Sequence, residues 1–225
     1  MGSIQSINTG NQESNIHIMI CHGFGATNRD LVDLASVLDP NGQFGWHFPQ
    51  GPLQIPNFNG YAWFPRHTES LTSALQGAYF NKLADLQETG LTASASELGN
   101  WIRQHDLQEK NWIFGGFSQG SMVALQTALQ EKMNILALII LSGTLIDRQE
   151  TTRLLRQTAP FPVFQSHGRQ DPVLPLPGAM ALRELLEEFG FKPDWQEFNG
   201  GHEIPPQIID SLHQFLGLIN AGHQP

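Results

Sequence analysis

Short, continuous apolar runs alternate along the chain with longer amphipathic stretches. The most apolar run is Ile135 to Leu141, and shorter ones lie at Ile16 to Cys21 and Trp112 to Phe114, with further strand candidates at Phe161 to Gly168 and Trp195 to Phe198. Runs of this length and composition are typical of strands buried on both faces of a sheet. They predict a central sheet whose strands are mostly parallel.

The segments between these runs have the spacing of helices. We expect helices at residues 29–38, 71–88, 92–105, 121–131, 178–189 and 206–218. Alternation of strand and helix predicts an α/β fold, with a mostly parallel central sheet and helices on both faces. A chain of 225 residues with 40% apolar content suits one domain, residues 1–225. The proline- and glycine-rich residues 39–60 are interpreted as a long loop of that domain, with a strand end near Trp46.

The pentapeptide Gly116-Phe117-Ser118-Gln119-Gly120 is a G-x-S-x-G motif between a predicted strand and a predicted helix. By itself the pentapeptide fits a glycine-rich turn as well as a catalytic site. Its strand–turn–helix context favours a nucleophile elbow, a sharp turn that presents a reactive serine at the beginning of a helix. Ser118 is therefore our candidate nucleophile. The backbone N–H of Gln119 would face an oxyanion formed there.

An acid and a base follow the elbow in the chain order Ser, Asp, His that such hydrolases use. Asp171 lies in a loop after the strand that ends near Gly168, and His202 follows the last strand in a loop opened by Gly200 and Gly201. In open α/β sheets, chemistry gathers at the carboxyl ends of the strands. We expect Asp171 to orient His202, and His202 to act as the general base.

Several other residues compete for these roles. Asp147 follows the strand next to the elbow strand and is the second candidate for the acid, whereas Asp194 and Glu203 are poorly placed for it. Five further histidines are interpreted as structural: His22, His47, His67, His105 and His167. For His167, next to the Asp171 loop, we expect a hydrogen-bonded supporting role, because buried polar groups normally find partners.

Acyl transfer needs a second oxyanion donor, usually from the loop after another central strand. The run Ile16 to Cys21 ends in His22-Gly23-Phe24-Gly25-Ala26. We choose the backbone N–H of Phe24, since Gly23 and Gly25 let the backbone approach a substrate closely. The alternative is an ordinary turn into the next helix. Trp63 and Phe64 are candidates for the substrate pocket, although packing of their loop onto the core explains them equally well.

Together these motifs resemble the phospholipase/carboxylesterase family of α/β-hydrolases, which includes acyl-protein thioesterases. The resemblance rests on His22 to Ala26, Trp63-Phe64, the elbow, Ser166-His167-Gly168 with Asp171-Pro172-Val173, and Gly201 to Ile204. It covers nearly the whole chain and implies the same residues: Ser118 as nucleophile, Asp171 and His202 as partners, and Phe24 and Gln119 as N–H donors.

The chain departs from the family pattern in two places. Pro65-Arg66-His67 follows Trp63-Phe64, where many relatives have an acidic residue, so the acyl-binding loop is expected to differ in shape. Only about fifteen residues precede the first clear strand. We therefore expect the edge strands at the beginning of larger relatives to be reduced or absent.

Charge and composition argue against nucleic acid and membranes as partners. A net charge of −9 with 12 Lys plus Arg offers no basic patch for nucleic acid or an anionic membrane. The longest apolar run is far shorter than the roughly 20 residues that span a bilayer, so we expect no stable membrane insertion. The polar N-terminus does not resemble a signal peptide. We expect a cytoplasmic protein; whether it acts alone or as a homodimer stays open.

The residues thus predict a serine carboxylester hydrolase that forms an acyl-enzyme on a small-molecule acyl ester or thioester, with no cofactor and no metal. Cys21, the one cysteine, is interpreted as an inert core thiol. Two enzymatic alternatives are an acyl-protein thioesterase and a lysophospholipase. An alternative of another class is a non-catalytic protein that binds an acyl ligand, because a fold does not by itself imply a function.

Overall fold

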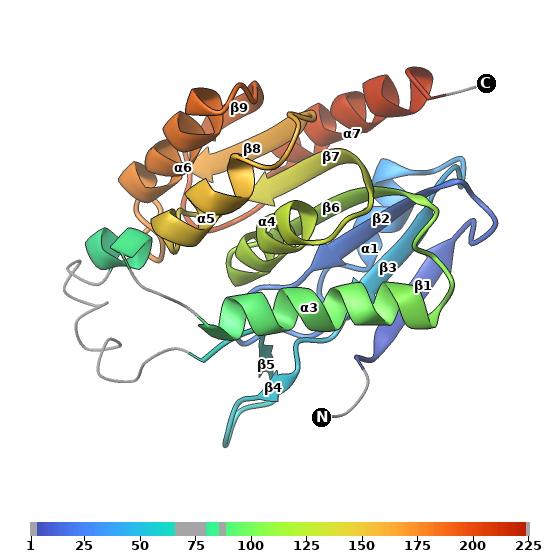
Figure 1. Cartoon of the computed structure of the whole chain (residues 1–225), viewed down its shortest axis with the longest axis horizontal. Helices are drawn as coiled ribbons and strands as arrows, with labels where there is room; N and C mark the ends of the chain where they lie inside the picture. The colour runs from blue at the N-terminus through green and yellow to red at the C-terminus, as the bar shows by residue number, and fades with distance from the viewer. Residues whose placement is uncertain (1–3, 66–79, 86–88, 224–225) are drawn as a thin grey trace.

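A seven-stranded sheet forms the centre of the molecule (Figure 1). The structure is a computed structural model that describes residues 4–65, 80–85 and 89–223. The strands lie in the order β1-β3-β2-β6-β7-β8-β9, and each adjacent pair is parallel except β1 and β3. Their bounds are β1 Ser6–Gly10, β2 Ile16–Cys21, β3 Gly45–Pro49, β6 Asn111–Phe117, β7 Asn134–Leu141, β8 Val163–Gly168 and β9 Pro193–Phe198. A small hairpin of β4 (Leu53–Gln54) and β5 (Tyr61–Ala62) lies outside this sheet.

Helices cover both faces of the sheet, as the sequence predicts. One face carries α3 (Thr89–Gln104), α4 (Gln119–Gln130), α5 (Arg148–Leu155) and α6 (Leu176–Glu188), and the other carries α1 (Asp33–Leu38) and α7 (Pro206–Ala221). Strand β2 shows how the sequence divides the core. Met19 and Cys21 pack into the cluster under α3 and α4, whereas Ile18 and Ile20 pack into the cluster under α1 and α7. This alternation is what a strand with two buried faces requires.

The predicted strands and most predicted helices are present, with two corrections. The helix predicted at 29–38 begins only at Asp33, because the side chain of Asp30 accepts hydrogen bonds from Thr27 and holds the preceding residues in turns. The helix predicted at 71–88 falls mostly outside the described residues; residues 80–85 form a 3₁₀ helix, η1 (Phe80–Asp85).

Strand β1, the β4–β5 hairpin and helix α5 were not predicted, and residues 39–60, interpreted as a long loop, contain strands β3 and β4. Strand β1 occupies the polar segment where edge strands were expected to be reduced or absent; it is short, but it pairs with β3 over its whole length. Helix α5 follows directly after Asp147, whose side chain accepts a hydrogen bond from the backbone N–H of Glu150. A capping residue three positions before a glutamate is a known sign of a helix beginning, and it was present in the sequence.

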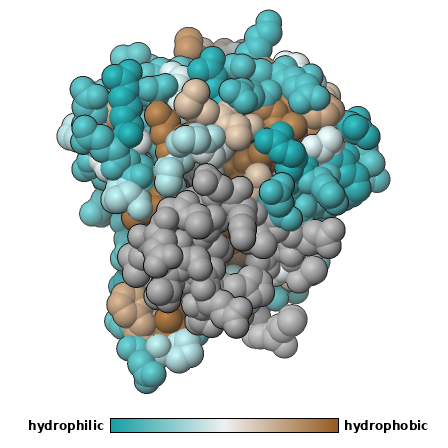
Figure 2. All heavy atoms as spheres, turned by 90° about the vertical axis from the view of Figure 1, so that its left-hand side faces the viewer, coloured by the Kyte–Doolittle hydropathy of each residue, from teal (hydrophilic) through white to brown (hydrophobic). Residues whose placement is uncertain are grey.

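The parallel strands all end at the same edge of the sheet, on the left in Figure 1. Figure 2 looks onto this side of the molecule, where hydrophobic surface lies among hydrophilic groups. The loops that follow β2, β6, β7, β8 and β9 therefore meet here, and these loops carry the residues of the predicted site. In the described residues, no helix is long and apolar enough to cross a membrane.

Candidate active site

Ser118 sits in a strained turn between β6 and α4. Its backbone has φ 56° and ψ −122°, a conformation that non-glycine residues rarely adopt. Two glycines make the turn possible: a Cβ on Gly116 would collide with the backbone of Gly120, and a Cβ on Gly120 would collide with the backbone of Cys21. The N–H of Ser118 donates to the carbonyl of Leu141 on the neighbouring strand β7 (2.9 Å). This is the geometry of a nucleophile elbow.

Asp171 and His202 lie together at the ends of β8 and β9. The Nδ1 of His202 is 2.6 Å from Oδ2 of Asp171, and the other oxygen, Oδ1, accepts the N–H groups of Val173 and Leu174 at 2.8 Å each. The Asp171 side chain is fully buried, whereas that of His202 is 14% exposed. The loops are tied to each other, since the N–H of Gln170 donates to the carbonyl of Gly200 (3.0 Å).

The environment of Asp171 keeps its carboxyl ionised. Burial alone would raise its pKa, but hydrogen bonds from His202 and the Leu174 N–H, the charge of His202 and the Val173 N–H together outweigh burial and hold the pKa below its usual range. An ionised Asp171 can accept a hydrogen bond from Nδ1–H of His202. The ring of His202 packs against that of Phe117, the residue before Ser118, with centroids 4.7 Å apart.

The loop after β2 passes close to the nucleophile. A Cβ on Gly23 would lie 3.5 Å from Cβ of Ser118, so Phe24 follows at the edge of the same turn. Strand β5 holds this loop through two hydrogen bonds, Gly25 N–H to Tyr61 O (2.8 Å) and Tyr61 N–H to Ala26 O (2.9 Å). Gln119 is the first residue of α4, where backbone N–H groups have no partner within the helix. Of the two predicted oxyanion donors, Phe24 therefore belongs to the loop after β2 and Gln119 to the first turn of α4.

The side chain of Gln119 has a role that the sequence did not reveal. Its Oε1 accepts the N–H of Trp63 and its Nε2 donates to the carbonyl of Phe64, both at 2.9 Å. The indole N–H of Trp63 donates to the carbonyl of His22 (2.8 Å), and the Ser94 hydroxyl donates to the carbonyl of Trp63. Trp63 thus connects the elbow, the β2 loop and α3. No local pattern could have indicated contacts between residues 55 and 56 positions apart in sequence.

Trp63 and Phe64 lie in the core cluster that packs under α3 and α4. Their exposed fractions are 0% and 5%, which fits the packing alternative for these residues. Trp63 also forms part of the wall of a cavity, described below. Their predicted contact with an acyl chain stays a prediction.

The competing histidines have structural partners. His22 is buried, with Nδ1 2.8 Å from the carbonyl of Gly23 and Nε2 accepting the N–H of Gly51 (2.9 Å). His167 is fully buried next to Asp171; its Nε2 donates to the carbonyl of Leu174 (2.7 Å) and lies 3.4 Å from Oδ2 of Asp171. His47 and His105 are also engaged away from the elbow, and His67 lies outside the described residues.

Two further sequence interpretations can be set against the structure. Asp147, the second candidate acid, caps α5 through Glu150 N–H. Burial raises the pKa of the Cys21 thiol, which therefore stays protonated inside the core. In the part of the chain that the structure describes, no group of three His, Cys, Asp or Glu residues is arranged to hold a metal ion.

A mostly parallel sheet, a serine on a strand–helix elbow and an Asp–His pair at adjacent strand ends define a hydrolase of the α/β class. The model of the phospholipase/carboxylesterase family matches residues 3–220. The chain belongs to this family, whose members are serine hydrolases.

Individual relatives agree with this assignment. Acyl-protein thioesterase 1 of Eremothecium gossypii is 29% identical over 217 residues, which are 91% of this chain and 88% of that protein. Among solved structures, esterase PE8 superposes with a TM-score of 0.78 at 24% identity, covering 97% of this chain and all of that one. Acyl-protein thioesterase 2 of Zea mays superposes with a TM-score of 0.71 at 20% identity, covering 96% and 98%. These two structures bear on the fold alone.

Proposed function

We propose that the protein is a serine carboxylester hydrolase in which Ser118, His202 and Asp171 form a catalytic triad. The observation that carries the proposal is the 2.6 Å contact between His202 Nδ1 and the buried Asp171 carboxylate. The ring of His202 packs against Phe117, the residue before the elbow serine. An imidazole held in this way has a fixed tautomer and gains stability as a cation, which is what a general base needs.

The proposed reaction proceeds in two acyl transfers. The Oγ of Ser118 attacks the acyl carbonyl carbon while Nε2 of His202 takes the hydroxyl proton, and the N–H groups of Phe24 and Gln119 receive the oxyanion. His202 then returns the proton to the departing alcohol or thiol as the carbon–oxygen or carbon–sulfur bond breaks. Water, deprotonated by His202, attacks the acyl-enzyme and releases the carboxylic acid and Ser118. Asp171 stays ionised throughout.

The deciding experiment is turnover of p-nitrophenyl esters from acetyl to palmitoyl by wild-type protein and by Ser118→Ala. Loss of a triad nucleophile costs about 10⁶ in kcat in a comparable serine hydrolase, so the variant should be almost inactive. Ser36→Ala is the control, because that hydroxyl donates to the carbonyl of Asp33 on α1, on the other face of the sheet. A loss below tenfold in a folded Ser118→Ala protein would refute the triad.

A second candidate function is hydrolysis of acyl thioesters, because the relative from Eremothecium gossypii named acyl-protein thioesterase 1 matches nearly the whole chain. Matched oxygen esters and thioesters of one acyl chain separate the two: a much higher kcat/KM for the thioester favours the thioesterase. A lysophospholipase would prefer a lysophospholipid over both. Retention of an apolar ligand without turnover of any ester would instead support a non-catalytic binding protein. A cytoplasmic location and a homodimer stay predictions, to be tested by cell fractionation and by light scattering.

A further inference from the structure

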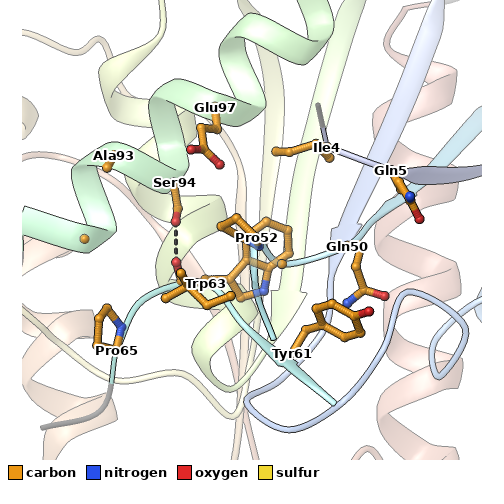
Figure 3. A pocket seen from close by; sticks show the side chains of 13 residues that line it. Ile4, Gln5, Gln50, Pro52, Tyr61, Trp63, Pro65, Ala93, Ser94 and Glu97 are labelled. Carbon is orange, nitrogen blue, oxygen red and sulfur yellow. Dashed lines mark hydrogen bonds between the residues drawn. The ribbon is translucent and has the colours of Figure 1, made fainter. Parts of the chain in front are cut away.

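A cavity of about 420 Å³ lies beside the candidate active site but contains none of its three triad residues. Its walls come from the beginning of the described chain at Ile4, the loop after β3, strand β5 and the first half of α3 (Figure 3). Cavities of this size are in the range that holds small ligands. The walls are mostly apolar, and Figure 3 shows Pro52 and Trp63 at the centre of the site.

The carboxyl group of Glu97 projects from α3 into this cavity, one helical turn after Ser94 (Figure 3). Its Oε2 is buried and has no hydrogen-bond partner, and it is one of three such side-chain atoms in the described residues. Of the described residues that line the cavity, only Glu97 carries a formal charge. A buried carboxylate oxygen without a donor is costly, since it has lost its water and gained nothing in exchange.

The residues that line the cavity indicate which kind of ligand would supply the missing partner of Glu97 Oε2. An ammonium group supplies N–H donors and a positive charge, and such a charge-assisted hydrogen bond is among the strong ones. Ile4, Pro52 and Ala93 also line the cavity and could contact a short apolar body. Tyr61 and Trp63 line it as well, and the faces of aromatic rings attract cations. The net charge of −9 further favours a cation over an anion.

We propose that this cavity binds a small organic cation, a primary ammonium whose N–H donates to Oε2 of Glu97 and whose short apolar body packs against Pro52 and Trp63. The cation site is separate from the hydrolase reaction and does not depend on it.

Binding of n-butylammonium chloride to the full chain, measured by isothermal titration calorimetry at neutral pH, tests the proposal. 1-Butanol is the matched ligand without charge. We expect butylammonium to bind at least tenfold more tightly than 1-butanol, and Glu97→Gln to remove at least that factor, as loss of a charge-assisted hydrogen bond implies. Glu188→Gln is the control variant, because it makes the same change of charge on the exposed end of α6.

A second variant keeps the test decisive if Glu97→Gln folds poorly. Ala93 is exposed and lines the cavity, so Ala93→Phe fills the space without changing the core and should abolish binding. The proposal is overturned if butylammonium binds no more tightly than 1-butanol, or if both variants bind it as well as wild-type protein. Because the readout is binding, the result is independent of whether Ser118 proves to be a nucleophile.

Discussion

Replacing Gln119 by leucine tests whether the connection between the elbow and Trp63 supports activity. Leucine is close to glutamine in size but has neither acceptor nor donor, so it removes both 2.9 Å hydrogen bonds at once. The backbone N–H of Gln119, the proposed oxyanion donor, is left in place. The change therefore separates the side chain from the backbone of the same residue.

The expected cost follows from the partners that are left behind. The N–H of Trp63 and the carbonyl of Phe64 belong to residues that are 0% and 5% exposed, so water cannot easily replace the lost bonds. Each buried group without a partner costs about 1–3 kcal/mol, which gives roughly 2–6 kcal/mol for the two. Part of this cost can be avoided only if residues 63–64 move away from the elbow. Such movement also displaces the β2 loop, because Trp63 bonds to His22 O.

Urea unfolding and kcat/KM for short and long p-nitrophenyl esters measure both consequences. We expect Gln119→Leu to lose stability and to lower kcat/KM by tenfold or more, since a shift of about 1.4 kcal/mol in transition-state stabilisation is tenfold in rate. Gln126→Leu is the matched control: it is a buried glutamine of the same helix that bonds to Gln130. It should lose stability and keep kcat/KM. Unchanged stability and activity in Gln119→Leu would refute the reasoning.

Two further predictions concern the acids and the buried histidines. Asp147→Ala should cost about 0.5–2 kcal/mol of stability through loss of the α5 cap and should keep kcat. Asp171→Asn should lower kcat by about 10⁴, as in a comparable triad. Equal losses of kcat in the two variants would show that the acid is misassigned. Burial, with the charges of His17 and His105, lowers the pKa of His47 from 6.5 to about 3. Only the unfolded state then takes up a proton as pH falls below 6.5, so stability is complete above that pH and decreases below it by up to about 1.4 kcal/mol per pH unit. Urea unfolding at pH 7 and pH 5 should show a smaller pH dependence in His47→Gln, and equal pH dependence would contradict the prediction.

Local sequence carried enough information for the fold class and for the elbow. The runs at Ile16–Cys21 and Asn134–Leu141 are buried strands because no polar residue interrupts their centres except His17, which is itself buried. The elbow was predictable because only glycine fits at positions 116 and 120, where a Cβ would collide with neighbouring backbone atoms. The order of acid and base also followed from the strand ends, and the structure brings His202 and Asp171 into contact.

The remaining features depend on partners that are distant in sequence. Strand β1 reads as polar because it is an edge strand, and its pairing with β3 sets Asn8 opposite His47. The hydrogen bonds from the Gln119 side chain to Trp63 and Phe64 likewise join residues that are distant in sequence. Helix α5 is different, since the sign at Asp147 and Glu150 is local, but the helix between Arg148 and Leu155 is mostly polar and lacks the apolar spacing that marks the other helices.

The placement of His202 after the last strand has a consequence for synthesis. The elbow is complete once β6 and α4 have formed beside β2 and β7, but the histidine loop is held by β9, which pairs only with β8 at the edge of the sheet. Helix α7 follows and packs against α1 near the beginning of the chain, where His213 Nδ1 bonds to the carbonyl of Leu38 (3.0 Å). During synthesis on the ribosome, Ser118 can therefore be in place long before His202 can. The contact between His202 and Asp171, on which the proposed activity depends, can therefore form only after β8 and β9 have been synthesised.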